Sequence, residues 1–298
     1  MIQSKIMIGT WPLSGDYGHI NMNQIQEALD CAYESGFREY DTAPSYGNGF
    51  MEFCLGNVFN HKSDVKINTK IGNLPFDGKS FDISVLKKSF EHTLRRLKRE
   101  TVNILYLHNP RNDVANYSEL IDFLNNLKVD GYINKLGLSM AKDFDYSEKV
   151  DINRFDVIQN DINLISLLPL NHSFNENIEL VARSPLASGI LTEKFLKTQM
   201  FPKDDHRSKW LTGERLLSIK KVVKILKQVS SLDLTSFALK FLLQDTRLNH
   251  IICGVKHKSH VIDLLKLDDY ADLTKIQIDT IYKLFEDNYE LESDKIIY

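Results

Sequence analysis

The chain has 298 residues and a formal net charge of −3, which is enough length for one large core or two smaller ones. Such a small net charge excludes a broad electrostatic attraction to nucleic acid or to an anionic membrane. The N-terminal segment has no signal-peptide pattern, and no stretch approaches the ~18 apolar residues of a membrane helix. Three widely spaced cysteines favour neither a disulfide framework nor a zinc site, so we expect a cytoplasmic protein.

Short apolar segments alternate with helix-period segments from one end of the chain to the other. Asn23 is expected to cap the first helix, with Gln26 three residues later, and Asp82 is expected to cap the second. Strands are predicted at 5–9, 37–41, 65–69, 102–107, 134–139, 155–160, 178–183 and 250–254. Helices are predicted at 23–35, 82–99, 117–130, 214–229, 235–244, 259–267 and 274–288. The stretch 164–177 gives no clear helix.

This alternation predicts a (β/α)8 TIM barrel, an α/β fold, built as a single domain over residues 1–298. The alternative is an open doubly wound sheet, but no G-x-G-x-x-G turn follows the first strand. The basic segment 214–229 is expected to be an outer helix of the barrel and not a membrane-binding helix.

Four polar side chains lie at or just after the ends of three successive predicted strands: Asp41, Tyr46, Lys70 and His108. Polar groups are costly in core positions unless they are paired, so we expect these four to share a site at the C-terminal end of the barrel. The Lys70 ammonium, held by Asp41, is expected to contact the Tyr46 hydroxyl and lower its pKa. Tyr46 then serves as a proton donor, and His108 polarises a carbonyl oxygen.

Each of these residues also has a structural interpretation when it is taken alone. His108 fits a hydrogen-bonded core histidine, Tyr46 fits a packed turn residue, Asp41 fits a loop cap, and Lys70 fits a strand end that reaches solvent. The four together in this order favour the catalytic interpretation. The set lacks an electron source, so the reduction of a carbonyl requires a hydride donor.

Nine sequence motifs resemble the aldo-keto reductase superfamily in their order and spacing. They are GTW at 9–11, DTAPSYGNG at 41–49, TKIG at 69–72, NILYLHNP at 103–110, GLS at 137–139, IQND at 158–161, SPLASGILTEKF at 184–195, FPKDDHR at 201–207 and IICGVK at 251–256. The resemblance covers nearly the whole chain. It implies that Tyr46 is the proton donor, that Lys70 and Asp41 tune it, and that His108 orients the carbonyl.

The loops after the seventh and eighth strands are where barrels of this kind often bind phosphate, and the second loop is basic. The resemblance implies that the first loop and the FPKDDHR segment hold a pyrophosphate, and that Lys256 and Lys258 meet a ribose 2′-phosphate, which favours NADP(H). The expected cofactor-binding residues are Thr10, Trp11, Asp41, Ser139, Gln159, Arg183, Ser184, Pro185, Leu186, Ser188, Gly189, Leu191, Lys194, Arg207, Gly254, Lys256, Lys258 and His260.

Four positions depart from the pattern of the superfamily. Met140 stands where an Asn usually binds the carboxamide, and Arg183 stands where an aromatic ring often stacks on the nicotinamide. His260 and Leu264 replace a Gln or Arg and an Asn near the adenine. We therefore expect weaker cofactor binding than is usual in the superfamily.

The sequence predicts a monomeric NADP(H)-dependent reductase that acts on a small aldehyde, ketone or keto sugar. The alternatives are a reductase-like barrel that binds NADP(H) without turnover, as a sensor or as a subunit, and a non-redox lyase or epimerase. Candidate pocket walls are Trp11, Phe50, Phe76, Asn109 and the stretch 199–209, and these do not distinguish an aryl aldehyde from a sugar.

Overall fold

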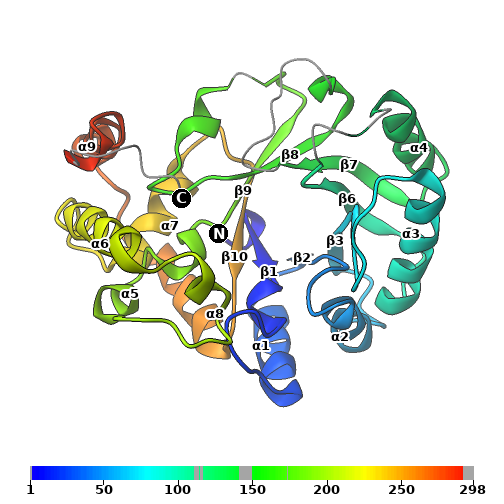
Figure 1. Cartoon of the computed structure of the whole chain (residues 1–298), viewed down its shortest axis with the longest axis horizontal. Coiled ribbons are helices and arrows are strands. Elements are labelled where there is room, and N and C mark those ends of the chain that lie inside the picture. Colours follow the sequence, from blue (N-terminus) through cyan, green and yellow to red (C-terminus); the bar gives the residue numbers. More distant parts are fainter. Residues whose placement is uncertain (1, 111–113, 115–116, 141–149, 173, 291–298) are drawn as a thin grey trace.

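Eight parallel strands close into a barrel in the computed structural model, which describes residues 2–110, 114, 117–140, 150–172 and 174–290 (Figure 1). In chain order these strands are β1 (Ile6–Gly9), β2 (Glu39–Asp41), β3 (Lys66–Ile71), β6 (Val102–His108), β7 (Ile133–Ser139), β8 (Val157–Asp161), β9 (Glu179–Arg183) and β10 (His250–Gly254). Their order around the barrel is β1-β10-β9-β8-β7-β6-β3-β2. The predicted (β/α)8 barrel and its eight strands are confirmed.

Helices surround the barrel, and the figure shows them on its outside (Figure 1). They are α1 (Met22–Glu34), α2 (Phe50–Val58), α3 (Ile83–Leu97), α4 (Tyr117–Val129), α5 (Glu193–Lys197), α6 (Gly213–Lys227), α7 (Leu234–Gln244), α8 (Lys258–Leu265) and α9 (Lys275–Glu286). Short 3-10 turns occur at Ile2–Ser4, Trp11–Leu13, Ile152–Arg154, Leu168–Asn171, Ala187–Gly189, His206–Lys209, Lys266–Asp268 and Asn288–Glu290. The stretch 164–177 has only one such turn among its described residues, in agreement with its weak helical pattern.

The predicted cap of α1 is wrong by two residues. Asn21, and not Asn23, accepts a hydrogen bond from the backbone N–H of Gln24 at 2.9 Å, and the Gln24 side chain accepts one from the Asn21 backbone at 3.1 Å. Both Asn-x-x-Gln patterns fit a capping box, and the earlier one adds two residues to the helix. At α3 the predicted cap is confirmed, because Asp82 accepts a hydrogen bond from Val85 N at 3.1 Å.

Helix α2 and a small hairpin of β4 (Asn73–Leu74) and β5 (Gly78–Lys79) are absent from the predicted elements. Helix α2 directly follows a glycine-rich turn, and glycines in the sequence indicate a loop. Its short apolar face of Met51, Cys54 and Leu55 was therefore not recognised as a helix. It packs so closely on α3 that a Cβ at Gly56 would lie 2.2 Å from the backbone oxygen of Arg96.

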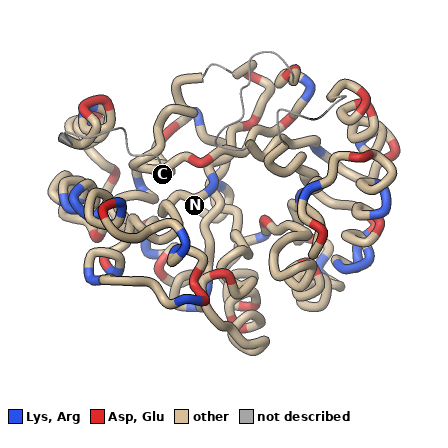
Figure 2. Tube along the Cα trace, viewed as in Figure 1, with Lys and Arg blue, Asp and Glu red and all other residues tan. Residues whose placement is uncertain are grey.

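The basic helix α6 is an outer helix of the barrel, as predicted, and it buries Leu216, Ile219, Val222, Val223 and Leu226. Lysines, arginines and acidic residues are all spread over the outside of the barrel (Figure 2). None of the described helices combines the length and the apolar character needed to cross a lipid bilayer.

The register of the strands brings the predicted site residues to one end of the barrel. His108 pairs with Ser139 across β6 and β7, and Ser139 pairs in turn with Gln159 on β8. Asp161 at the end of β8 pairs with Arg183 at the end of β9. Because all eight strands are parallel, their C-terminal ends form one rim above the apolar layers of the barrel interior.

Candidate active site

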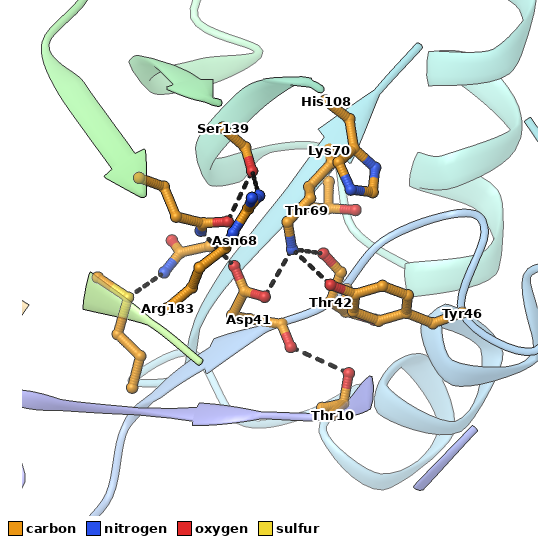
Figure 3. A network of polar contacts seen from close by, with 12 residues as sticks. Thr10, Asp41, Thr42, Tyr46, Asn68, Thr69, Lys70, His108, Ser139 and Arg183 are labelled. Carbon is orange, nitrogen blue, oxygen red and sulfur yellow. Dashed lines mark hydrogen bonds and ion pairs between the residues drawn. The ribbon is translucent and has the colours of Figure 1, made fainter. Parts of the chain in front are cut away.

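The Lys70 side chain lies at this rim and connects two of the other expected catalytic residues, Asp41 and Tyr46 (Figure 3). Its ammonium donates hydrogen bonds to Asp41 Oδ1 at 2.6 Å, to the backbone oxygen of Thr42 at 2.8 Å and to the Tyr46 hydroxyl at 3.2 Å. These three bonds use all the protons of the ammonium, which is almost completely buried. The expected contact between Tyr46 and Lys70 is confirmed.

The expected net lowering of the Tyr46 pKa is wrong. Burial raises the pKa of Tyr46, and the nearby Lys70 charge only partly offsets it because Asp41 acts in the opposite sense. Burial also opposes the charge on Lys70, but Asp41 and Tyr46 outweigh it and the Lys70 pKa is raised. At neutral pH the site therefore holds a protonated phenol beside a permanent ammonium.

The ring of His108 lies near that of Tyr46, with the ring centroids 6.4 Å apart and the rings nearly perpendicular. Burial, together with the charges of Lys70 and Arg183, lowers the pKa of His108 well below its usual value, so its ring is neutral. Its Nδ1 lies 3.1 Å from Nδ2 of Asn73, which has protons to donate. With Nδ1 as the acceptor, the ring proton lies on Nε2, and His108 can donate it to a substrate oxygen.

A chain of hydrogen bonds continues from Asp41 around the rim. Gln159 Nε2 donates to Asp41 Oδ2 at 3.1 Å, and Ser139 Oγ donates to Gln159 Oε1 at 2.8 Å. Arg183 Nη1 donates to Ser139 Oγ at 2.8 Å. Ser139, Gln159 and Arg183, which are expected to bind the cofactor, thus belong to one network with the residues expected to transfer a proton.

A cavity of about 1480 Å³ opens at this rim and extends along the loops after β9 and β10 to α8. It is lined by most of the expected site residues: Trp11, Asp41, Tyr46, His108, Gln159, Arg183, Ser184, Pro185, Leu186, Ser188, Gly189, Lys194, Arg207, Gly254, Lys256 and His260. Thr10, Lys70, Ser139 and Leu191 are buried beneath the wall, and Lys258 is exposed beside it. The Thr10 hydroxyl donates to the backbone oxygen of Asp41 at 3.0 Å, which supports that residue from below.

The loop after β9 is a tight turn with several residues in the left-handed region. Ser184, Ala187, Ser188 and Gly189 all have positive φ angles, of 53°, 49°, 57° and 82°. The backbone N–H groups of Ala187, Gly189, Ile190 and Leu191 donate to backbone oxygens within this loop, which fixes its shape. Asn163 holds the start of this loop by donating to the backbone oxygen of Ser184 at 3.0 Å.

The cations expected to bind phosphate already have partners within the protein. Lys256 Nζ donates to the backbone oxygens of Tyr17, at 2.5 Å, and Gly18, at 3.2 Å. Lys258 forms an exposed ion pair with Glu27 at 3.3 Å. Arg207 pairs with Asp205 at 2.6 Å. These residues fit a dinucleotide by their charge and position, but binding requires them to share or exchange their present contacts.

The departures from the superfamily pattern are visible in the same cavity. Leu264 is buried and lines the wall near α8, where it offers no polar group. His260 Nδ1 accepts a hydrogen bond from the backbone N–H of Lys256 at 3.2 Å. Arg183 lines the cavity wall, and its terminal nitrogens donate to four groups of the protein.

Of the expected substrate walls, Trp11 and Asn109 line the cavity, as do Met200, Phe201, Pro202, Asp205 and Arg207 from the stretch 199–209. Phe76 is 83% exposed on the hairpin, and neither it nor Phe50 belongs to the wall. Sequence reasoning missed Tyr17, Asn73 and Asp161. Asp161 ends a buried strand as Asp41 does, so the same pattern pointed to it, whereas Tyr17 and Asn73 lie in loops that carry no such pattern.

Comparisons with known proteins agree with this architecture. The model of the Aldo/keto reductase family matches residues 5–286. The chain is similar to L-galactose dehydrogenase of Arabidopsis thaliana, with 27% identity over 274 residues, covering 87% of this chain and 82% of that protein. It is also similar to a probable voltage-gated potassium channel subunit beta of the same plant, with 24% identity, covering 95% and 93% of the two chains.

Among solved structures, that of a glycerol dehydrogenase from Gluconobacter oxydans superposes over 100% of both chains with a TM-score of 0.79 and 19% identity. At that identity the likeness shows the fold alone. The family match covers nearly the whole sequence, and this chain therefore belongs to the aldo/keto reductase family.

Proposed function

We propose that the protein is an NADP(H)-dependent reductase that converts the carbonyl group of a small aldehyde, ketone or keto sugar to an alcohol. The observation that carries the proposal is the contact of 3.2 Å between the Tyr46 hydroxyl, which lines the cavity, and the Lys70 ammonium buried beneath it. Bound NADPH would supply the hydride. The protein must then supply a proton and stabilise negative charge on the substrate oxygen.

Tyr46 supplies the proton to that oxygen. Its raised pKa keeps the hydroxyl protonated at neutral pH, and the Lys70 ammonium stabilises the phenolate that forms when the proton leaves. Asp41 holds Lys70 in place. His108 donates its Nε2–H to the same oxygen and polarises the carbonyl before the proton moves.

The proposed cofactor site runs from Gln159 and Ser139, which would hold the carboxamide, to the loops after β9 and β10. Preference for NADPH over NADH rests on the charges of Lys256 and Lys258 at the far end of the cavity. Because Lys256 is shared with two backbone oxygens and Leu264 offers no polar contact, we propose that the cofactor binds less tightly than is usual in the family. We propose a monomer that acts in the cytoplasm.

The test is the oxidation of NADPH, followed at 340 nm, with a panel of activated aldehydes and ketones. The variant Tyr46→Phe is expected to lower kcat by roughly 10²–10⁴-fold, the usual contribution of general acid catalysis, while NADPH affinity by calorimetry stays within about twofold. Tyr40→Phe provides a control, because this tyrosine lies on β2 outside the cavity wall. Full turnover by Tyr46→Phe would refute the role of the proton donor.

A barrel that binds NADP(H) without turnover is the second candidate, favoured by the similarity to a potassium channel subunit. Tight NADPH binding without reduction of any carbonyl in the panel would establish it in place of the reductase. If no nicotinamide cofactor binds, both proposals fail and a non-redox use of Tyr46 and Lys70 gains support.

A further inference from the structure

Asn109 lies directly after His108 at the end of β6, and both residues line the main cavity. Successive side chains of an extended strand point to opposite faces, so two neighbours do not normally reach the same space. Asn109 departs from the strand with a φ of 46°, in the left-handed region. Asn tolerates this conformation better than most residues, and such departures concentrate at functional sites.

Three hydrogen bonds fix the position of Asn109. Its backbone N–H donates to the oxygen of Ser139 at 2.7 Å, and its backbone oxygen accepts a bond from Lys79 at 3.0 Å. Its side-chain Oδ1 accepts a bond from Arg183 Nη1 at 2.9 Å. A guanidinium can only donate, so the oxygen of the carboxamide must face Arg183. The amide nitrogen lies on the other branch, and it has no hydrogen-bond partner among the residues that the structure describes.

The terminal nitrogens of Arg183 are committed to the protein. Nη1 donates to Asn109 and Ser139, and Nη2 donates to the backbone oxygen of Met140 at 2.6 Å and to Asp161 at 2.9 Å. These four bonds use the four protons of the two nitrogens. Arg183 therefore has no terminal pair of donors left for a substrate carboxylate, which argues against a keto acid and in favour of a neutral substrate.

We infer that Asn109 determines substrate specificity by donating its side-chain N–H to a hydroxyl on the carbon next to the reacting carbonyl. The inference rests on the proposed function and names its substrate class: 2-hydroxy aldehydes and 2-hydroxy ketones, including open-chain sugars. The Cα atoms of His108 and Asn109 lie about 3.8 Å apart and both residues line the cavity, so the two side chains can contact one small substrate. The carbonyl becomes an alcohol, the neighbouring hydroxyl is unchanged, and the product is a vicinal diol.

The test compares 2-hydroxypropanal with propanal, which differ only in that hydroxyl. Wild-type kcat/KM with NADPH is expected to favour 2-hydroxypropanal by roughly 10-fold or more beyond the ratio of the two rates with borohydride, which measures intrinsic reactivity. Asn109→Asp and Asn109→Ala are each expected to lower this preference by roughly 10-fold. The Asp side chain keeps an oxygen that accepts from Arg183 but adds a negative charge, whereas Ala removes both the side-chain oxygen and the amide nitrogen. The loss of the side-chain N–H is therefore the only change that the two variants share.

Asn60→Asp makes the same chemical change on the exposed segment after α2 and is expected to keep the wild-type preference. A crystal structure with NADP⁺ and propane-1,2-diol gives a second readout that needs no variant. It is expected to place Asn109 Nδ2 within hydrogen-bond distance of one diol oxygen while the other lies at Tyr46 and His108.

A wild-type preference no greater than the borohydride ratio would overturn the inference and leave the reductase standing. The inference would also be overturned if both Asn109 variants kept the wild-type preference for 2-hydroxypropanal, or if the bound diol did not contact Asn109 Nδ2. If neither aldehyde, nor any other carbonyl of the panel, is reduced by the wild type, the proposed function fails and the inference fails with it.

Discussion

The two halves of the cavity differ in how far the protein has prepared them for their ligands. In the half proposed to be catalytic, Asp41 and Lys70 are buried and Tyr46 is half-buried, and the Lys70 ammonium bonds to both of the others in the arrangement expected for proton transfer. In the half proposed to bind phosphate, which we call the phosphate half, Lys256, Lys258 and Arg207 are more exposed, and each is bound to a group of the protein that a ligand must displace or share.

The difference follows from desolvation. A charge buried under the rim has no access to water, so it must be paired permanently, and the pairing fixes its geometry. A charge at the open end of the cavity keeps much of its hydration, and exchanging one partner for another costs little. The catalytic half is therefore rigid by necessity, whereas the phosphate half can adapt when a cofactor binds.

The largest expected effect is the loss of the buried charge in the catalytic half. Lys70→Met leaves the Asp41 carboxylate buried without its counter-ion, which should lower the free energy of unfolding by about 3–5 kcal/mol and reduce turnover by more than about 100-fold. Urea unfolding and NADPH oxidation measure the two effects. Lys66→Met, at the exposed start of the same strand, is the control and should change neither. If the Lys70→Met protein were as stable and active as the wild type, the catalytic half would not depend on a permanent charge pair, and the proposed contrast between the two halves would be wrong.

A smaller effect is expected in the phosphate half. Lys256→Met removes one positive charge and the contact with the backbone of Tyr17 and Gly18, so the Kd for NADPH should rise by roughly 10-fold. Turnover at saturating cofactor should change by less than about twofold, because this residue does not touch the reacting atoms. The control is Lys221→Met on the exposed face of α6. If kcat fell with Kd unchanged, Lys256 would belong to the catalytic half.

The smallest expected effect is that of pH. The pKa of Tyr46 is raised above 10, so its proton is present at neutral pH and is lost only as the pH rises beyond that value. The pKa of His108 lies well below 6.5, so its ring stays neutral down to acidic pH. Carbonyl reduction at saturating substrates should therefore vary by less than about twofold between pH 6.5 and 9. A steep change inside this range that disappears in His108→Gln would contradict the assigned state of that ring.

The sequence predicted the barrel well because its strands are short apolar runs bounded by turn residues, a local signal that survives folding. It also predicted which side chains meet at the rim, since parallel strands bring their C-terminal ends together. The predicted direction of the shift in the Tyr46 pKa was wrong, because this shift depends on a balance between burial and the opposed charges of Lys70 and Asp41. Spacing alone says nothing about the depth of burial. The partners of Lys256 were missed for a related reason: they are backbone oxygens of a distant loop, and no residue type marks them.

The hydrogen bonds from Arg183 through Ser139, Gln159, Asp41 and Lys70 to Tyr46 have a consequence for the history of the chain. When side chains depend on one another in series, the cost of replacing two members is not the sum of the separate costs, because the second replacement acts on a network that is already broken. A single substitution in this series is therefore unfavourable until its neighbours in the network are replaced as well. A lineage that alters the chemistry of this rim is expected to exchange several members together, while the loops beyond it diverge one residue at a time.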